Sequence, residues 1–146
     1  MSPRTAFDAD VLIYAAVPRH PLGTRIATLF QADPASAATG ELGIGSVLLL
    51  TEVLAKPLRD ARRSDEVAAL VGLLGRLELY PVDESTARLA LALAVAYGLH
   101  AADASHLATA VVAGADRFLT NNRKDFPKTI TEIDIVYPDE LPPAPA

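Results

Sequence analysis

Apolar residues along the chain follow two patterns, short continuous runs and longer stretches with the spacing of one helix face. Short apolar runs are typical of buried strands, and apolar residues three and four positions apart are typical of helices. The runs predict five strands, over residues 5–8, 41–45, 77–82, 117–120 and 133–137. The helical spacing predicts helices over residues 10–14, 21–32, 65–76, 85–97 and 102–113, and a further helix that begins at residue 47.

Residues that start and end helices lie at the boundaries of these segments. Asp10 is expected to cap the first helix, and Ser46 is expected to cap the helix that begins at Val47. Gly98 supplies the left-handed position that ends the helix over residues 85–97. The sequence therefore predicts where some of the helices begin and end, as well as which segments are helices.

Strands that alternate with helices predict a parallel sheet with helices on both faces. The expected fold class is α/β, with three layers (α/β/α) and a central, mainly parallel sheet of about five strands. In such sheets the functional site lies beyond the carboxyl ends of the strands, near a switch in strand order. Polar residues are therefore expected to gather at that edge.

The composition indicates one domain, over residues 1–137, followed by a proline-rich tail over residues 138–146 that is expected to be disordered. No apolar stretch is long enough to predict a membrane span, and the N-terminus lacks the pattern of a signal peptide. The chain has no cysteine, which excludes disulfides and thiolate metal sites. The cytoplasm is the expected location.

The net charge of −5 argues against broad electrostatic capture of nucleic acid, for which a basic surface is expected. It does not exclude a nuclease. Acids that hold divalent cations make the bare charge misleading, because the metal reverses the local sign.

Three acidic residues lie in apolar surroundings far apart in the sequence. Asp8 directly follows the first strand, Glu52 interrupts an apolar helical segment, and Asp103 is the acid of an alanine-rich helix. Each has a simple structural explanation when taken alone. Asp8 fits a helix cap, Glu52 fits a pair with Lys56 four residues on, and Asp103 fits the positive end of a helix.

Taken together, these acids indicate a metal site. Carboxylates that converge at one sheet edge repel one another strongly unless a divalent cation lies between them. Oxygen ligands suit Mg²⁺ or Mn²⁺, and carboxylate-bound Mg²⁺ commonly acts on phosphate substrates. The residues therefore point to phosphoryl chemistry without selecting a substrate.

Four segments, in order, resemble the motifs of the PIN domain family. They are FDADVLIYA (residues 7–15), IGSVLLLTEV (44–53), HAADASHLATA (100–110) and ADRFLTNNRKDF (115–126). The resemblance runs from about Thr5 to Tyr137, and the single PIN-like domain looks most like a VapC-type toxin ribonuclease of a VapBC toxin–antitoxin system.

The resemblance implies a Mg²⁺-dependent endoribonuclease, with Mn²⁺ as a substitute, that hydrolyses RNA phosphodiester bonds with a metal-activated water. It also implies a VapB-type antitoxin as partner and a homodimer. It leaves open whether the substrate is tRNA, rRNA or mRNA, and whether one or two metals bind.

The family's site roles carry over to this chain by motif. The acidic core that holds the metal is Asp8, Glu52 and Asp103. The fourth catalytic position falls to Asn122 or Asp125. Residues expected to orient the carboxylates are Asp10, Ser46 and Thr120. Residues expected to contact RNA phosphates are Arg123 and Lys124.

Other residues have two interpretations each. His100 and His106 flank Asp103 at three residues on either side, which allows a His-Asp-His metal site or ordinary buried or solvent-facing histidines. A basic stretch suits RNA phosphates or a solvated face: Lys56, Arg59, Arg62 and Arg63. An apolar group suits a dimer or antitoxin surface or ordinary core: Leu70, Val71, Leu73, Leu74 and Leu77.

Two other functions remain alternatives. Asp8-Ala9-Asp10 also resembles the Asp-x-Asp start of haloacid-dehalogenase-type phosphatases, in which the first Asp is a nucleophile. The second alternative is a non-catalytic PIN-like module that binds RNA or protein. The phosphatase family also requires a strand-end Thr or Ser, a distant Lys and a late acidic pair, which cannot all be placed in this chain. The loss of the fourth acid keeps the binding module open, and the three retained core acids count against it.

Overall fold

A parallel sheet of five strands forms the middle of the structure, a computed structural model that describes residues 3–31 and 43–145. Its strand order is β3-β2-β1-β4-β5, and every neighbouring pair is parallel. The sheet predicted as mainly parallel is thus entirely parallel among the described residues. The strands are β1 (Thr5–Phe7), β2 (Gly43–Ser46), β3 (Leu77–Tyr80), β4 (Arg117–Leu119) and β5 (Asp134–Val136).

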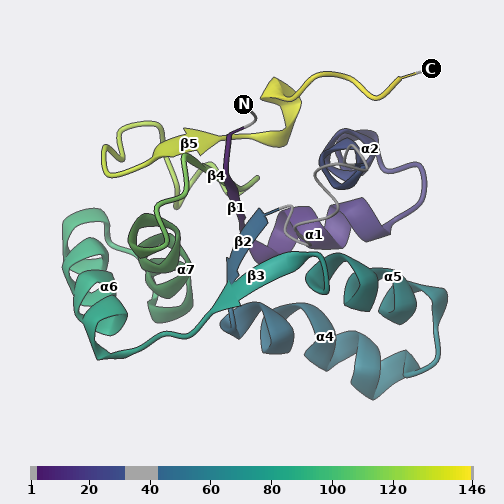
Figure 1. Ribbon diagram of the computed structural model, residues 1–146, viewed down its shortest axis with the longest axis horizontal. Coiled ribbons are helices and arrows are strands. Elements are labelled where there is room, and N and C mark those ends of the chain that lie inside the picture. The colour runs from purple at the N-terminus through teal and green to yellow at the C-terminus, as the bar shows by residue number, and fades with distance from the viewer. Residues whose placement is uncertain (1–2, 32–42, 146) are drawn as a thin grey trace.

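Helices cover both faces of the sheet, which confirms the three-layer prediction (Figure 1). One face carries α6 (Glu84–Tyr97) and α7 (Ala101–Val112). The other carries α1 (Ala9–Ala16), α2 (Pro21–Ala27), α4 (Leu48–Ala61) and α5 (Asp65–Leu74). Two short 3₁₀ helices complete the described elements, η1 (Thr28–Phe30) and η2 (Pro138–Glu140).

Alternation along the strands divides the core into two parts. Ala6 and Phe118 pack with α6 and α7, whereas their neighbours Phe7 and Leu119 pack with the helices of the other face. Successive side chains of a strand point to opposite faces, so apolar residues at every position of these short strands fill both layers. The continuous apolar runs follow from burial on both faces.

The helix starts differ in detail from the prediction. Asp8, not Asp10, is the N-cap of α1, and its Oδ1 accepts a hydrogen bond of 2.8 Å from the N–H of Ala9. Helix α4 begins at Leu48 rather than at residue 47, although Ser46 Oγ accepts a 3.1 Å hydrogen bond from the N–H of Leu48. Asp10 lies inside the first turn of α1, which leaves its carboxylate free for a contact elsewhere.

Two other boundaries also moved. Helix α2 ends at Ala27 and continues as η1, and the last predicted residue of that helix, residue 32, lies outside the described residues. Residues 41 and 42 of the second predicted strand also lie outside them. Gly98 ends α6 as expected, with φ of 67° and its N–H donated to the carbonyl of Ala94.

The start of the proline-rich tail is ordered, contrary to the prediction of disorder. Residues 138–140 form η2, and Leu141 is 4% exposed in the core beside α1 and α2. Arg25 Nη1 donates to the carbonyls of Asp139 at 3.0 Å and Leu141 at 2.9 Å. A side chain from α2 thus donates to backbone carbonyls of a segment that does not pair with a strand.

The apolar group around α5 is core for the most part. Leu70, Leu74 and Leu77 are buried, and Val71 is exposed at 51%. The core interpretation therefore holds for those three leucines, and a docking surface made of the whole group is wrong. No helix among the described residues has both the length and the apolar character that a membrane crossing requires.

Candidate metal centre

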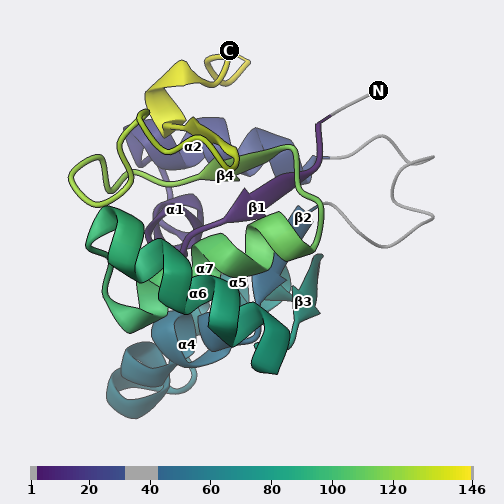
Figure 2. The ribbon, with the colours of Figure 1, turned by 90° about the vertical axis from the view of Figure 1, so that its left-hand side faces the viewer.

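Strand β1 lies in the middle of the sheet, with β2 on one side and β4 on the other (Figure 2). Strands β2 and β3 extend the sheet on one side of β1, and β4 and β5 extend it on the other side. Phe7 pairs with Leu119, so Asp8 and Thr120 are the next residues after two adjacent strand ends. This is the switch in strand order at which open α/β sheets bind ligands. The prediction that polar residues gather at this edge is confirmed for these two side chains.

Asp8 is only 5% exposed, and two hydrogen bonds hold its side chain in place. Its Oδ2 accepts from Thr120 Oγ1 at 2.7 Å, and its Oδ1 accepts from the N–H of Ala9. Burial raises the pKa of Asp8, while the hydrogen bond from Thr120 and the nearby His106 act to lower the pKa. The hydrogen bonds therefore orient the carboxylate of Asp8, but its surroundings offset the cost of burying its negative charge only in part.

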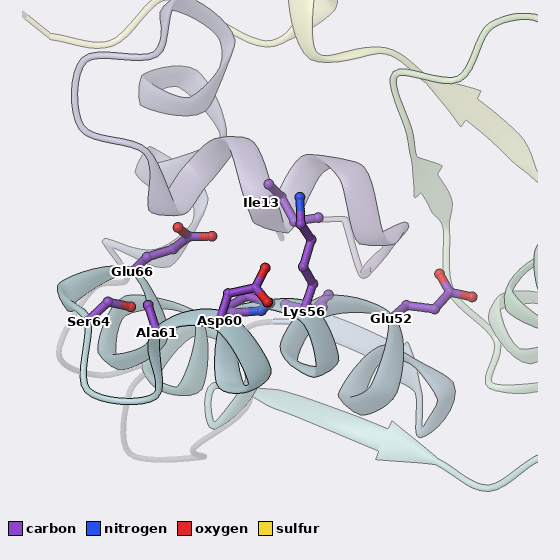
Figure 3. Close-up of a pocket in the computed structure, with 9 residues that line it drawn as sticks. Ile13, Glu52, Lys56, Asp60, Ala61, Ser64 and Glu66 are labelled. Atoms are coloured by element: carbon purple, nitrogen blue, oxygen red, sulfur yellow. The ribbon is translucent and has the colours of Figure 1, made fainter.

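Glu52 brings a second carboxylate to Asp8 from helix α4. One oxygen of Asp8, one oxygen of Glu52 and one ring nitrogen of His106 all lie within 4.8 Å of one another. Glu52 Oε1 is 3.1 Å from His106 Nε2, and Figure 3 shows its carboxylate turned away from Lys56. The i,i+4 pair expected as the simple explanation of Glu52 is thus replaced by a contact with α7.

Asp103 belongs to the same electrostatic neighbourhood. It lies half-buried in the first turn of α7. Burial raises the pKa of Asp103, and the negative charges of Asp8, Asp125 and Glu52 raise the pKa further. A half-buried acid whose ionised form is disfavoured by three neighbouring carboxylates belongs to a group that a divalent cation would stabilise.

Asp10 is a further acid close to Asp8, and it is bonded to the loop after β4. Its Oδ2 accepts a 3.1 Å hydrogen bond from the N–H of Asn121, and its buried Oδ1 has no hydrogen-bond partner. Burial, followed by the charge of Asp8, raises the pKa of Asp10 to about 7. Asp10 therefore ties α1 to the loop after β4, which carries the fourth motif.

Asn122 and Asp125 bond to each other in both directions. Asn122 Nδ2 donates to Asp125 Oδ2 at 2.9 Å, and the N–H of Asp125 donates to Asn122 Oδ1 at 3.2 Å. The N–H of Asn122 also donates to Thr120 Oγ1 at 3.1 Å. The amide of Asn122 is occupied in fixing the turn and Asp125, while Asp125 is the residue that influences Asp103.

The two basic residues expected at the RNA differ in their surroundings. Arg123 Nη2 lies 2.6 Å from Asp139 Oδ2, and its guanidinium stacks 4.3 Å above the ring of Tyr137. Lys124 is exposed beside it. Arg123 thus holds the C-terminal segment. Of the two residues, Lys124 is therefore the more available for the expected contact with an RNA phosphate. In the basic stretch of α4, Arg59 contacts Asp60 at 3.4 Å.

His106 is the member of the group that sequence reasoning undervalued. It is buried on α7, one turn after Asp103, while His100 lies exposed at the N-cap of the same helix. A lone histidine on an otherwise apolar, alanine-rich helix face was the available signal. The symmetric His-Asp-His arrangement is wrong, because only His106 joins Asp8 and Glu52 among the described residues.

The donor set fits a divalent cation. It offers the carboxylate of Asp8 after β1, the carboxylate of Glu52 from α4, an unpartnered histidine from α7 and a hydrogen bond that orients the most buried acid. Oxygen-rich sites of this kind hold Mg²⁺ or Mn²⁺ and polarise phosphate oxygens. The arrangement is thus suited to hydrolysis at phosphorus.

Comparison with known proteins shows the family of the chain. The PIN domain family matches residues 6–130. A solved structure of a toxin–antitoxin complex from Klebsiella pneumoniae has a similar fold, with a TM-score of 0.68 and 22% identity over 92% of this chain and 97% of that one. No curated protein matches the sequence. The family match covers the strands and helices that carry every acid of the site, and the chain belongs to the PIN domain family.

Proposed function

We propose that the protein is a metal-dependent endoribonuclease and the toxin of a type II toxin–antitoxin system. PIN domains are generally nucleases. The observation that carries the proposal is that the carboxylates of Asp8 and Glu52 meet at the switch point, where the charges of both also raise the pKa of Asp103. The family assignment removes the support for an Asp-x-Asp phosphatase.

Each acid has a proposed role in holding the ion. Asp8, Glu52 and Asp103 bind it, and Asp125 fills the fourth position in preference to Asn122. Thr120 and Asp10 fix the carboxylate and the loop through the hydrogen bonds described above. Ser46 fixes the start of α4, the helix that carries Glu52.

The reaction proposed is hydrolysis of an RNA phosphodiester bond. Mg²⁺, or Mn²⁺ in its place, supplies Lewis acidity to the phosphate and lowers the pKa of the attacking water. One of the site carboxylates accepts the proton of that water. The oxygen of the water attacks phosphorus and the 3′-oxygen leaves, so the products carry a 5′-phosphate and a 3′-hydroxyl. The cytoplasm is the proposed location, since RNA is the proposed substrate.

We also propose where an antitoxin binds. A groove of about 430 Å³ lies between α1 and α4 and continues from Glu52 (Figure 3). Its lining combines apolar side chains with three acids and one lysine: Ile13, Glu52, Val53, Lys56, Pro57, Asp60, Ala61, Ser64 and Glu66. An amphipathic segment with basic residues matches that surface and would end at the metal site. The similar fold in a toxin–antitoxin complex supports such a partner.

A homodimer is the remaining part of the proposal. Leu91 and Val95, four residues apart on α6, are exposed at 66% and 79%. Apolar residues at this spacing form one helix face, which suits self-association. Leu91→Glu is expected to shift the sedimentation coefficient from dimer to monomer, with Ala69→Glu, at an exposed position of α5, as control. A wild-type monomer at all concentrations would contradict the dimer.

The cleavage test uses purified protein and total RNA with Mg²⁺, Mn²⁺ or EDTA. Discrete fragments with 5′-phosphates are expected with either metal, and none with EDTA or with the variants Asp8→Ala and Asp103→Ala. Fragments that persist in EDTA would overturn the metal-dependent mechanism. Intact RNA in every reaction of a folded protein would favour the non-catalytic binding module.

A further inference from the structure

His106 is buried in a way that calls for a partner. Its side chain is 1% exposed, and neither ring nitrogen makes a hydrogen bond. Nε2 lies 3.1 Å from Glu52 Oε1, yet the two atoms are not aligned as a hydrogen bond. A buried polar group without a partner is costly, so native proteins rarely keep one without a reason.

The other two histidines show the contrast. His20 Nδ1 accepts hydrogen bonds from the N–H groups of Leu22 and Gly23 and caps α2. His100 is exposed to solvent at the start of α7. His106 has no hydrogen-bond partner and almost no access to solvent, and one of its ring nitrogens lies within 4.8 Å of carboxylate oxygens of Asp8 and Glu52.

The spacing of the donor atoms fits a shared ion. Ligands about 2.1–2.2 Å from one ion lie about 3.0 Å apart when they are adjacent and about 4.3 Å apart when they are opposite. The His106 to Glu52 distance of 3.1 Å matches an adjacent pair. The donor atoms of Asp8, Glu52 and His106 all lie within 4.8 Å of one another, so they form one cluster.

We propose that His106 Nε2 is a direct ligand of the divalent cation held by Asp8 and Glu52. The centre is then a mixed nitrogen and oxygen site, and it binds Mn²⁺ in preference to Mg²⁺. Mg²⁺ prefers oxygen ligands and dehydrates reluctantly, whereas imidazole suits first-row transition metals. This inference rests on the proposed function only in assuming that the acidic group binds a divalent cation.

The test detects nitrogen coordination directly. Mn²⁺ is added to the untagged protein, and electron spin echo modulation records the coupling of the metal to ¹⁴N. In protein labelled with ¹⁵N-histidine the coupling is expected to change to that of ¹⁵N. The coupling should persist in His100→Gln and disappear in His106→Gln. The labelled wild-type protein reports by itself whether any histidine binds the metal, so absence of the coupling there overturns the proposal even if a variant misfolds.

Binding affinity gives a second readout by calorimetry. The wild-type protein is expected to bind Mn²⁺ at least about tenfold more tightly than Mg²⁺, and His106→Gln should remove most of that preference. His106→Asn provides a second substitution, and circular dichroism checks the fold of each variant. A wild-type Mn²⁺ complex with no histidine coupling would overturn the proposal.

RNA cleavage is measured on the same samples, which separates the two proposals. Cleavage without histidine coupling would overturn the ligand role of His106 and support the nuclease. Histidine coupling without cleavage would support the ligand role and count against the nuclease.

Discussion

The hydroxyl of Thr120 donates a 2.7 Å hydrogen bond to Asp8 Oδ2 and so joins the ends of β4 and β1. Both side chains are buried, Thr120 completely. Thr120 Oγ1 also accepts from the N–H of Asn122, so the backbone of the fourth motif is linked through this hydroxyl to the most buried acid. Hydrogen bonds in such a chain polarise one another. The position of Asp8 therefore depends on a residue at the end of a different strand.

Removal of this hydroxyl should weaken metal binding. Thr120→Val keeps the shape of the side chain and loses the bond that orients Asp8. Partners of this kind typically contribute about ten- to hundredfold to metal affinity, and we expect a loss in that range for Mn²⁺. Calorimetric titration measures it, and Thr120→Ser, which retains the hydroxyl, should bind nearly as well as wild type. Equal affinities in all three proteins would contradict the role of Thr120.

The stability of the metal-free protein should fall as the pH rises. The pKa of Asp10 is raised to about 7, so between roughly pH 4 and 7 the folded protein binds a proton that the unfolded chain has released. Burial raises the pKa of Asp8 and of Asp103 in the same direction. The melting temperature in EDTA should therefore decrease from pH 5 to pH 8.

Asp10→Asn isolates one contribution to this effect. Asparagine resembles the protonated acid and can still accept from the N–H of Asn121. The variant should melt at a higher temperature than wild type at pH 8 and at a similar temperature at pH 5. Differential scanning fluorimetry across this range measures both proteins. Parallel pH profiles for the two would contradict the raised pKa of Asp10.

Asp125 should matter more than Asn122 for metal binding and cleavage. The Asn122 amide is occupied by Asp125, whereas Asp125 influences the charge state of Asp103. Asp125→Asn should lower the single-turnover cleavage rate by about tenfold or more, because it removes a negative charge from the site. Asn122→Ala should have the smaller effect, through loss of positioning. The reverse order would assign the fourth position to Asn122.

Lys124 and Arg123 should differ in their effects on RNA affinity. Lys124→Ala in an Asp103→Asn background should weaken the binding of a single-stranded RNA and reduce the salt slope by about 0.7, the value for one phosphate. Arg123→Ala should change the slope less and should lower the melting temperature, because Arg123 pairs with Asp139 and stacks on Tyr137. Fluorescence anisotropy at several salt concentrations measures the slopes. Identical slopes for wild type and Lys124→Ala would refute the phosphate contact.

Leu141 should contribute to stability although it lies in a proline-rich segment. Its side chain is 4% exposed, and Leu141→Ala should cost about 2–3 kcal/mol of unfolding free energy. Urea denaturation measures the cost, with the exposed Pro143→Ala as a control that should be neutral. Equal midpoints for Leu141→Ala and wild type would show that the segment does not pack in solution.

The strand and helix pattern could be predicted from sequence because it depends on local periodicity. The runs around Phe7 and Leu119 are apolar throughout because helices cover both sheet faces, and the helical stretches have the wider spacing of covering helices. The acids Asp8, Glu52 and Asp103 were recognisable because each interrupts an apolar segment. Their presence on different elements at one edge follows from the parallel topology.

Contacts between distant segments could be decided only by the tertiary structure. Asp8 and Asp10 are equally good helix caps in the sequence, and the choice of Asp8 leaves Asp10 to bond to the loop after β4. Local spacing pairs Glu52 with Lys56, whereas the tertiary fold places Glu52 of α4 at 3.1 Å from His106 of α7, a helix of the other layer. Arg25 and Leu141 show the same principle, since a proline-rich segment becomes ordered when a distant helix supplies its donors. The sequence determined the order of strands and helices and which acids interrupt apolar segments, and the tertiary fold decided which side chains meet, His106 among them, because burial and electrostatic pairing depend on neighbours that local pattern does not specify.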